Sequence, residues 1–255
     1  MTQTSLAWRV EETCLNAWPA LRQVLLDGWA LRFSEGLTRR SNSANPLRAG
    51  DHGVDALIPA CEALYQSQLL PTIFRLPSII GPALDQRLDA LGYGAEGDSH
   101  ALYGDIDDVA GTRDPDVRLS VHPTPEWFQA MAALQNHTIE QSRIYRRIIG
   151  AIVIPAAFAA LTIEGEFVAL AYGALHGGLL CYESVITDAR RQRRGYARRV
   201  IATLAAWAKD EGARGACLEV EADNAPALAL YDAIGLKTRL YRYHYRREPG
   251  SIARL

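Results

Sequence analysis

The sequence is poor in lysine and free of long apolar segments, and each shortage excludes a class of protein. Lys209 and Lys237 are the only lysines among 27 Lys and Arg residues, and the formal net charge is −2. A chain with this balance has no overall field that would draw it to nucleic acid or anionic lipid. The longest apolar stretch, residues 151–163, is too short to cross a bilayer and contains Pro155. The first residues lack a basic segment followed by an apolar core, so we expect a soluble, cytoplasmic protein without a membrane partner.

Cysteine is also scarce, and neither cysteine nor histidine shows metal-ligand spacing. Cys14, Cys61, Cys181 and Cys217 stand far apart in the sequence and form no C-x-x-C pair. This argues against a disulfide framework and against a zinc site. The six histidines contain no H-x-x-x-H pair. We therefore expect reduced thiols and no metal.

The composition is that of an ordinary globular protein, with 49% hydrophobic and 22% charged residues in a chain of 255. That length suffices for one large core or two modest ones. Charge, glycine and proline replace the hydrophobic periodicity at residues 107–117. We place a domain boundary there, between an N-terminal domain (1–110) and a C-terminal domain (115–255).

Downstream of this boundary, strand-like and helix-like segments alternate. The pattern predicts strands at residues 166–178, 179–187, 216–222 and 236–248, and helices at 196–211 and 224–235. Helices interleaved with strands indicate an α/β or α+β sheet covered by helices. The last strand alternates Tyr241, Tyr243 and Tyr245 with polar residues, which is typical of one packed and one solvated face.

The two halves of the chain share a weak internal repeat. LDALGY at residues 88–93 matches YDAIGL at 231–236 in an Asp, Ala, apolar, Gly core, 143 residues apart. The same offset lays apolar positions 57, 58 and 61 over 200, 201 and 204. Either short apolar patterns match by chance, or the chain contains a duplicated unit whose first copy has diverged. At this offset the first copy has Asp51, His52, Gly81 and Leu88 in place of Arg194, Gly195, Asn224 and Tyr231.

The run RRQRRGYARRV at residues 190–200 contains six arginines and precedes a predicted helix. A phosphate site needs backbone N–H groups in a turn, a glycine that lets the anion approach, and a helix N-terminus facing the charge. Gly195, the small Ala197 and the flanking Arg193, Arg194 and Arg198 meet these needs. A solvated helix face or a nucleic-acid patch are the alternatives, although such a patch would normally include lysine and a basic surrounding domain.

The second half resembles the GNAT superfamily of acyl-CoA-dependent N-acyltransferases. The family signature is a strand followed by Gln or Arg, two residues, Gly, one residue, and Gly or Ala at the start of a helix, and Gln192, Gly195 and Ala197 occupy those places. The next conserved stretch resembles LEVEADNAPALALYDAIGL, which contains Asn224, Tyr231 and Gly235. The resemblance covers about residues 115–247, with mild departures at Ala189 and Ala197.

The resemblance implies a fold and a cosubstrate. We expect two GNAT-like domains, each a mixed, mostly antiparallel sheet flanked by helices, with acetyl-CoA between two splayed central strands. The N-terminal domain is expected to be a degenerate copy that cannot bind CoA. No metal is needed for the reaction that the resemblance implies.

The resemblance also assigns residues to this site. It implies Tyr231 as the general acid for the CoA sulfur and Glu183 as a candidate general base. The expected cosubstrate-binding residues are Val185, Ile186, Thr187, Gln192, Arg193, Arg194, Gly195, Tyr196, Ala197, Arg198, Asn224 and Tyr231. Glu219 and Glu221 share one face of the adjacent strand and are expected to attract a cationic amine. The alternatives are a half-buried packing tyrosine, and carboxylates that are solvated at an edge or act as salt-bridge partners.

The acceptor side is less defined by the sequence. The polar stretch TRRSNSANPL, residues 38–47, resembles the N-terminal stretch of some two-domain family members, and Arg40, Asn42 and Asn45 are expected to line the acceptor pocket unless this is a capped surface loop. We expect an N-acetyltransferase that moves an acetyl group to a primary amine, either of a small molecule or of a peptide N-terminus, by direct transfer in a ternary complex. It would act as a monomer or homodimer without nucleic acid. The alternatives are a non-catalytic CoA- or ligand-sensing module and a nucleic-acid binder.

Overall fold

One mixed sheet of eleven strands runs through the computed structural model, which describes residues 3–50, 53–109 and 111–251. The strand order is β1-β2-β3-β4-β11-β5-β10-β9-β8-β7-β6. The strands are β1 (Arg22–Leu26), β2 (Trp29–Phe33), β3 (Ala44–Pro46), β4 (Ile73–Pro77), β5 (Gly94–Asp105), β6 (Val117–Ser120), β7 (Ala156–Ile163), β8 (Glu166–His176), β9 (Leu179–Thr187), β10 (Gly215–Glu221) and β11 (Thr238–Arg247).

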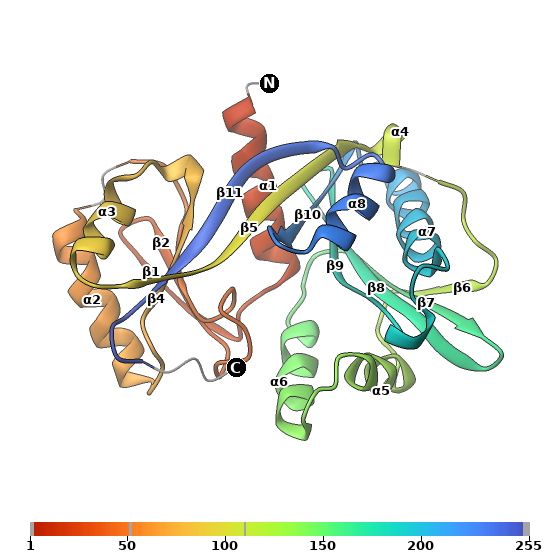
Figure 1. Ribbon diagram of the computed structural model, residues 1–255, viewed down its shortest axis with the longest axis horizontal. Coiled ribbons are helices and arrows are strands. Elements are labelled where there is room, and N and C mark those ends of the chain that lie inside the picture. Colours follow the sequence, from red (N-terminus) through yellow and green to blue (C-terminus); the bar gives the residue numbers. More distant parts are fainter. Residues whose placement is uncertain (1–2, 51–52, 110, 252–255) are drawn as a thin grey trace.

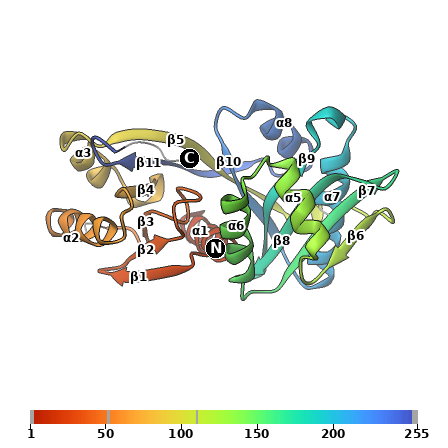
Figure 2. The ribbon, with the colours of Figure 1, turned by 90° about the horizontal axis from the view of Figure 1, so that it is seen from below.

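Helices cover both faces of this sheet (Figures 1 and 2). They are α1 (Gln3–Ala17), α2 (Val54–Ser67), α3 (Ala83–Ala90), α4 (Ile106–Val109), α5 (Pro125–Leu134), α6 (Ile139–Gly150), α7 (Tyr196–Asp210) and α8 (Ala225–Ala233), with short 3-10 turns at Ser78–Ile80 and Ala189–Arg191. No helix in the described part of the chain is both long and apolar enough to cross a membrane. The strands and helices predicted downstream of residue 115 are all present, and the mixed α/β fold class is confirmed.

The strand order is pseudo-symmetric about the central pair β5 and β11. Outward from this pair come β4, β3, β2 and β1 on one side and β10, β9, β8 and β7 on the other, and β6 is an extra edge strand. These two long strands curve side by side through the middle of the molecule (Figure 1). Each of these strands also pairs with a strand from the other half of the chain. Strand β11, from the end of the chain, pairs with β4, and β5, from the first half, pairs with β10. The two halves thus exchange their last strands. The division into domains 1–110 and 115–255 stays a prediction, and the sheet is continuous past that boundary.

The predicted repeat matches the helices but is displaced by one residue in the strands. In the helices, Leu57 and Ile58 of α2 are buried as are Val200 and Ile201 of α7, in agreement with the offset of 143. In the strands, that offset would equate Arg75 of β4 with Leu218 of β10, whereas Arg75 contacts α1 and Leu218 packs in the core with α7. A one-residue slip moves every strand side chain to the opposite face, so one ungapped offset cannot serve both kinds of element.

The starts of the two helices also correct one expected difference between the copies. Gly53 is the residue before α2 and has a left-handed φ of 63°, as Gly195 has before α7 with a φ of 77°. The first copy therefore keeps a glycine at the start of its helix. Leu88 does replace Tyr231 and is fully buried, while Asp51 and His52 lie outside the described residues.

Three groups of buried side chains form the core. One lies between the sheet and helices α1, α5 and α6, the second lies beneath α4, α7 and α8, and the third joins α2 and α3 to β2, β3 and β4. Helix α1 begins the chain, yet it lies against β8 and β9 of the second half. The buried tyrosines of β11 face this first core, as the alternation of the sequence predicts.

Candidate functional site

The site begins with a gap between two parallel strands at the centre of the sheet. Strands β9 and β10 pair only from Leu179 to Cys181 and from Gly215 to Cys217. Beyond this point β9 continues to Thr187 and stays paired with β8 on its other side. A bulge lies in that pairing, and Ser184 has a φ of 51°. The separation matches the splayed strand pair that the resemblance implies, and it leaves the β9 edge at Val185, Ile186 and Thr187 without a strand partner in the described chain.

The six arginines of residues 190–199 divide into two sets. Three are held by carboxylates: Arg190 by Asp188, Arg191 by Glu166, and Arg199 by Asp114 and Asp116. In the described part of the chain, Arg193, Arg194 and Arg198 form no ion pair, and all three are exposed. Half of the run therefore supports the loop, and the other half is available to an anion.

The available arginines surround the start of α7. Gly195 is the residue before this helix, and a Cβ added there would meet no atom within 4 Å, so the space in front of the glycine is open. Tyr196 and Ala197 begin the helix, whose first N–H groups lack intrahelical acceptors. Such an end attracts negative charge. Arg198 also lines a cavity of about 380 Å³ between α7 and α8, together with Lys237, while Gln192 is exposed before the turn.

Helix α8 places Tyr231 on the α7 side of the sheet. Tyr231 is 8% exposed and packs in the core beneath α7. Burial, with a smaller effect of the Glu183 carboxylate, raises the pKa of Tyr231 to about 12, so the phenol stays protonated at neutral pH. Asn224 lies just before the helix, and its side-chain oxygen accepts a hydrogen bond from the Ala227 backbone N–H. It thus caps the helix that carries Tyr231.

Glu183 projects from β9 to the opposite, α1 side of the sheet. Its carboxylate accepts a hydrogen bond from Arg40 at 2.7 Å, and the residue is 6% exposed. Burial raises the pKa of the Glu183 carboxyl above its ordinary value, and Arg40 only partly offsets this effect. A carboxylate with a raised pKa and a protonated phenol therefore lie on the two sides of the gap.

Glu183 is the end of a buried chain of ion pairs. Arg75 of β4 binds both Glu11 of α1 and Glu219 of β10, and Arg40 binds Glu219 at 2.9 Å and then Glu183. Burial alone would raise the pKa of Glu219, but Arg75 and Arg40 hold it below its ordinary value. Sequence reasoning missed Glu11 and Arg75. The available signal for Arg75 was a single charged residue inside the apolar segment IFRLP.

The residues expected at the acceptor side separate into two groups. Arg40, Glu219 and Glu221 line one cavity on the α1 side of the sheet. Asn42 instead supports its own loop, because its amide oxygen accepts from the backbone N–H groups of residues 34 and 36, at 2.7 and 3.0 Å. Asn45 is fully buried and donates to the backbone carbonyl of residue 43 at 2.6 Å. Both asparagines lie outside the lining of this cavity.

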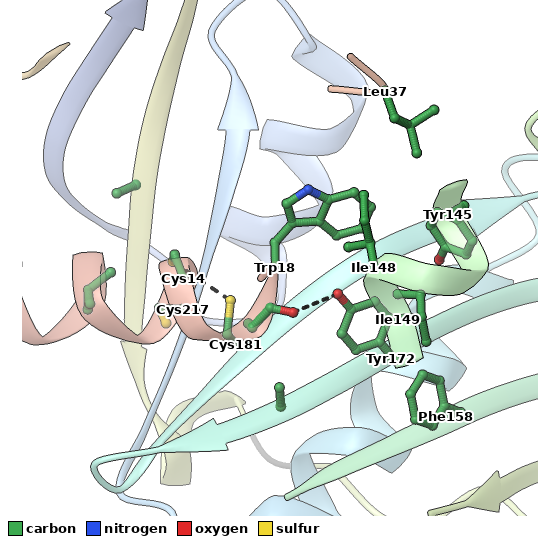
Figure 3. Close-up of a cluster of buried hydrophobic side chains, with 14 of the residues drawn as sticks. Cys14, Trp18, Leu37, Tyr145, Ile148, Ile149, Phe158, Tyr172, Cys181 and Cys217 are labelled. Atoms are coloured by element: carbon green, nitrogen blue, oxygen red, sulfur yellow. Dashed lines mark hydrogen bonds between the residues drawn. The ribbon is translucent and has the colours of Figure 1, made fainter. Parts of the chain in front are cut away.

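Three cysteines that are far apart in the sequence meet beside the gap (Figure 3). The sulfur atoms of Cys14, Cys181 and Cys217 lie within 4.8 Å of one another, and all three residues are buried. Cys181 and Cys217 form the last paired position of β9 and β10, beneath Cys14 of α1. The contact with Cys181 is the largest of the causes that hold the pKa of Cys14 well above its ordinary value. The spacing of the cysteines in the sequence gives no sign of this cluster.

The sequence and the fold are similar to those of known acetyltransferases. The family described as "Probable histone acetyltransferase Rv0428c C-terminal" matches residues 4–246. The chain belongs to this family. It is 24% identical over 245 residues to the "Uncharacterized N-acetyltransferase YobR" of Bacillus subtilis, covering 93% of this chain and 97% of that protein. It is also 27% identical over 187 residues to the "Probable histone acetyltransferase Rv0428c" of Mycobacterium tuberculosis, covering 73% of this chain and about half, 51%, of that protein.

Solved structures share the fold of this family member. A GCN5-related N-acetyltransferase from Kribbella flavida superposes with a TM-score of 0.70 at 16% identity, covering 98% of this chain and 96% of that one. A tandem GNAT protein from the clavulanic acid biosynthesis pathway gives a TM-score of 0.63 at 12% identity, covering 82% and 76%. The expected GNAT superfamily membership is confirmed, and the protein is an acyltransferase of this type.

We predict that replacing Arg75 with leucine lowers the free energy of unfolding by about 3–5 kcal/mol, because Glu11 and Glu219 would be left buried without their shared partner. Urea denaturation measures this change. In the matched control, Arg113→Leu breaks the exposed pair of Arg113 with Asp210 and should cost under about 1 kcal/mol. Equal losses for the two variants would contradict the role assigned to the ion-pair chain.

Proposed function

We propose that the protein is an N-acetyltransferase that moves an acetyl group from acetyl-CoA to a primary amine by direct transfer in a ternary complex. The observation that supports this most is the gap between β9 and β10, which has a proton donor on one side and a proton acceptor on the other. The reaction needs both, since the amine must lose a proton and the departing thiolate must gain one.

The donor side of the gap fits a CoA pyrophosphate. The open turn at Gly195 and the three available arginines offer backbone N–H groups and guanidinium groups to an anion. The β9 edge at Val185, Ile186 and Thr187 offers strand-type hydrogen bonds to an amide-containing arm. In this proposal Asn224 holds the start of α8 and so positions Tyr231.

Acetyl-CoA supplies a thioester whose carbonyl carbon the amine attacks, forming the C–N bond as the C–S bond breaks. Glu183 accepts the proton that the amine nitrogen releases, because its raised pKa makes it a stronger base than an ordinary carboxylate. Tyr231 donates its phenolic proton to the departing sulfur. Arg40 holds the Glu183 carboxylate in place through the contact at 2.7 Å.

A second candidate is a module that binds CoA or another ligand without turnover. The pairing of Glu183 with Arg40 favours this alternative, since a carboxylate bound to arginine is a weaker base. The kinetic test below separates the two. We further propose cytoplasmic action as a monomer or homodimer, with no metal, membrane or nucleic-acid partner.

We predict that acetyl-CoA at about 100 times its Kd raises the unfolding temperature of the wild type by about 5–11 °C. The variant Gly195→Asp should lose most of this shift, because an aspartate at the helix start opposes a pyrophosphate. Gly212→Asp is the matched control, as Gly212 also has a positive φ and open space but lies at the other end of α7. Equal shifts for the two variants would contradict the assigned pyrophosphate site, and no shift in the wild type would contradict acetyl-CoA binding.

We predict that Tyr231→Phe lowers kcat by about 10²- to 10⁴-fold while the affinity for acetyl-CoA stays unchanged, since only the proton donor is lost.

In the wild type, kcat/KM should rise with pH through a pKa above the usual 4.5 of a glutamate, and Glu183→Gln should remove this limb. Steady-state rates of thiol release between pH 5 and 9 measure both effects. A rate unchanged in both variants would contradict the assigned roles, and a wild type that binds acetyl-CoA without turnover would favour the sensing module.

A further inference from the structure

A second cavity, on the α1 side of the sheet, adjoins Arg40 and Glu219 and has no role in holding the donor. Its volume is about 440 Å³, which is in the range of small-molecule pockets. The first half of the chain supplies Leu37, Thr38, Arg39, Arg40, Glu96 and Ser99, and the second half supplies Glu219, Val220, Glu221, Tyr243, Tyr245 and Arg247. Because Arg40 joins this cavity to Glu183, an amine could approach the proposed base from here.

The charges of the cavity do not suit an acceptor with several positive groups. Glu219 is already bound by Arg75 and Arg40, and Glu96 accepts two hydrogen bonds from Arg247, at 3.1 and 2.8 Å. Only Glu221 is largely exposed, at 64% of its side chain. A polyamine or a lysine-rich peptide would therefore meet arginines and carboxylates that are already neutralised.

Arg39 differs from the other arginines of the cavity because it is oriented without being hydrogen-bonded. Its guanidinium lies 5.1 Å from the centroid of the Tyr245 ring. On another side lies Gly97, where an added Cβ would come within 2.8 Å of the Arg39 Cζ atom. Arg39 forms long ion pairs with Glu96 and Glu221, at 3.9 and 3.8 Å, and both distances are beyond hydrogen-bond range. Within the described chain, the guanidinium thus lies over the Tyr245 ring between two carboxylates, and no hydrogen bond uses its N–H donors.

We propose that Arg39 binds a carboxylate of the acceptor, so that the acceptor is an amino acid or a similar small amino carboxylate. This inference rests on the proposed acetyltransferase function. The planar guanidinium matches a carboxylate in two parallel hydrogen bonds. Arg40 lines the same cavity as Arg39 and contacts Glu183 at 2.7 Å, so in this proposal the amine of the acceptor lies on the Arg40 side of the cavity, toward Glu183.

The test compares matched acceptors on the full-length protein. Thiol release from acetyl-CoA is measured with the common amino acids, with their α-carboxamides, with 2-aminoethyl phosphate, with spermidine and with a lysine-rich peptide. For at least one amino acid we expect kcat/KM to exceed that of its carboxamide by about 10- to 100-fold, the effect of one charge-assisted contact. Arg39→Gln should remove this preference by lowering the value for the acid while leaving that for the carboxamide.

A pair of glycine variants tests the orientation of Arg39 without removing its charge. Gly97→Ala should displace the guanidinium from the Tyr245 ring and reduce the preference for the acid. Gly81→Ala is the control, because both glycines have a positive φ, which is 87° at Gly81 and 65° at Gly97. An added Cβ at Gly81 meets nothing within 4 Å. The control should keep the wild-type preference.

Three outcomes would overturn this inference. In the first, a carboxamide, spermidine or the peptide is acetylated with a kcat/KM equal to that of the acids. In the second, 2-aminoethyl phosphate is preferred to every acid, which would make the bound group a phosphate. The third is acetyl-CoA binding by thermal shift with no acid acetylated, which leaves the donor site intact. A wild type that shows no acetyl-CoA binding would instead contradict the proposed function itself.

Discussion

The chain of buried ion pairs from Glu11 to Glu183 is the constraint that joins the fold to the site. It connects α1, β4, β10, the loop before β3, and β9, so it crosses from the first half of the chain to the second. Removing such charges from water costs several kcal/mol per ion, and the structure recovers this only when each partner is in place. Arg75 is fully buried and lies 3.9 Å from the centroid of the Tyr243 ring. The position of Glu183 therefore depends on the packing of both halves.

The exchanged strands also make the site depend on both halves of the chain, here through the backbone. Since β11 completes the first half and β5 completes the second, the cavity beside Arg40 and Glu219 contains residues from both. The residues proposed to bind the donor differ in this respect, because all of them lie in the second half. The first half keeps the glycine before its helix but has a β3 of only three residues, Ala44–Pro46, and a buried Leu88 where the second half has Tyr231. In the proposed function, the second half binds the donor and the first half completes the acceptor side.

Local patterns predicted the second half well. The turn at Gly195, the helix after it and the alternation of β11 are short-range features, in which neighbouring residues decide the conformation. The motif around Gln192, Gly195 and Tyr231 also predicted the superfamily, which the family match over residues 4–246 confirms. The roles of these residues stay predictions until they are measured.

Long-range contacts could not be predicted in the same way. The three thiols meet only because α1 packs against β9 and β10, and Arg75 reaches Glu219 only because the sheet is continuous. The ungapped offset of 143 failed in the strands because a single inserted residue reverses the face of a side chain. Asn42 and Asn45 seemed suited to a ligand by residue type, yet Asn42 is hydrogen-bonded within its own loop and Asn45 is a buried residue of β3 that donates to the backbone of residue 43.

We propose that only the second half binds acetyl-CoA, and hydrogen exchange measured with and without this ligand distinguishes the two halves. When acetyl-CoA is added, we expect slower amide exchange at residues 182–187 on the open edge of β9 and at residues 193–198 around Gly195. Exchange at the corresponding segments of the first half, residues 44–46 and 53–57, should stay unchanged. Protection of the first-half segments, or none in the second half, would contradict the account.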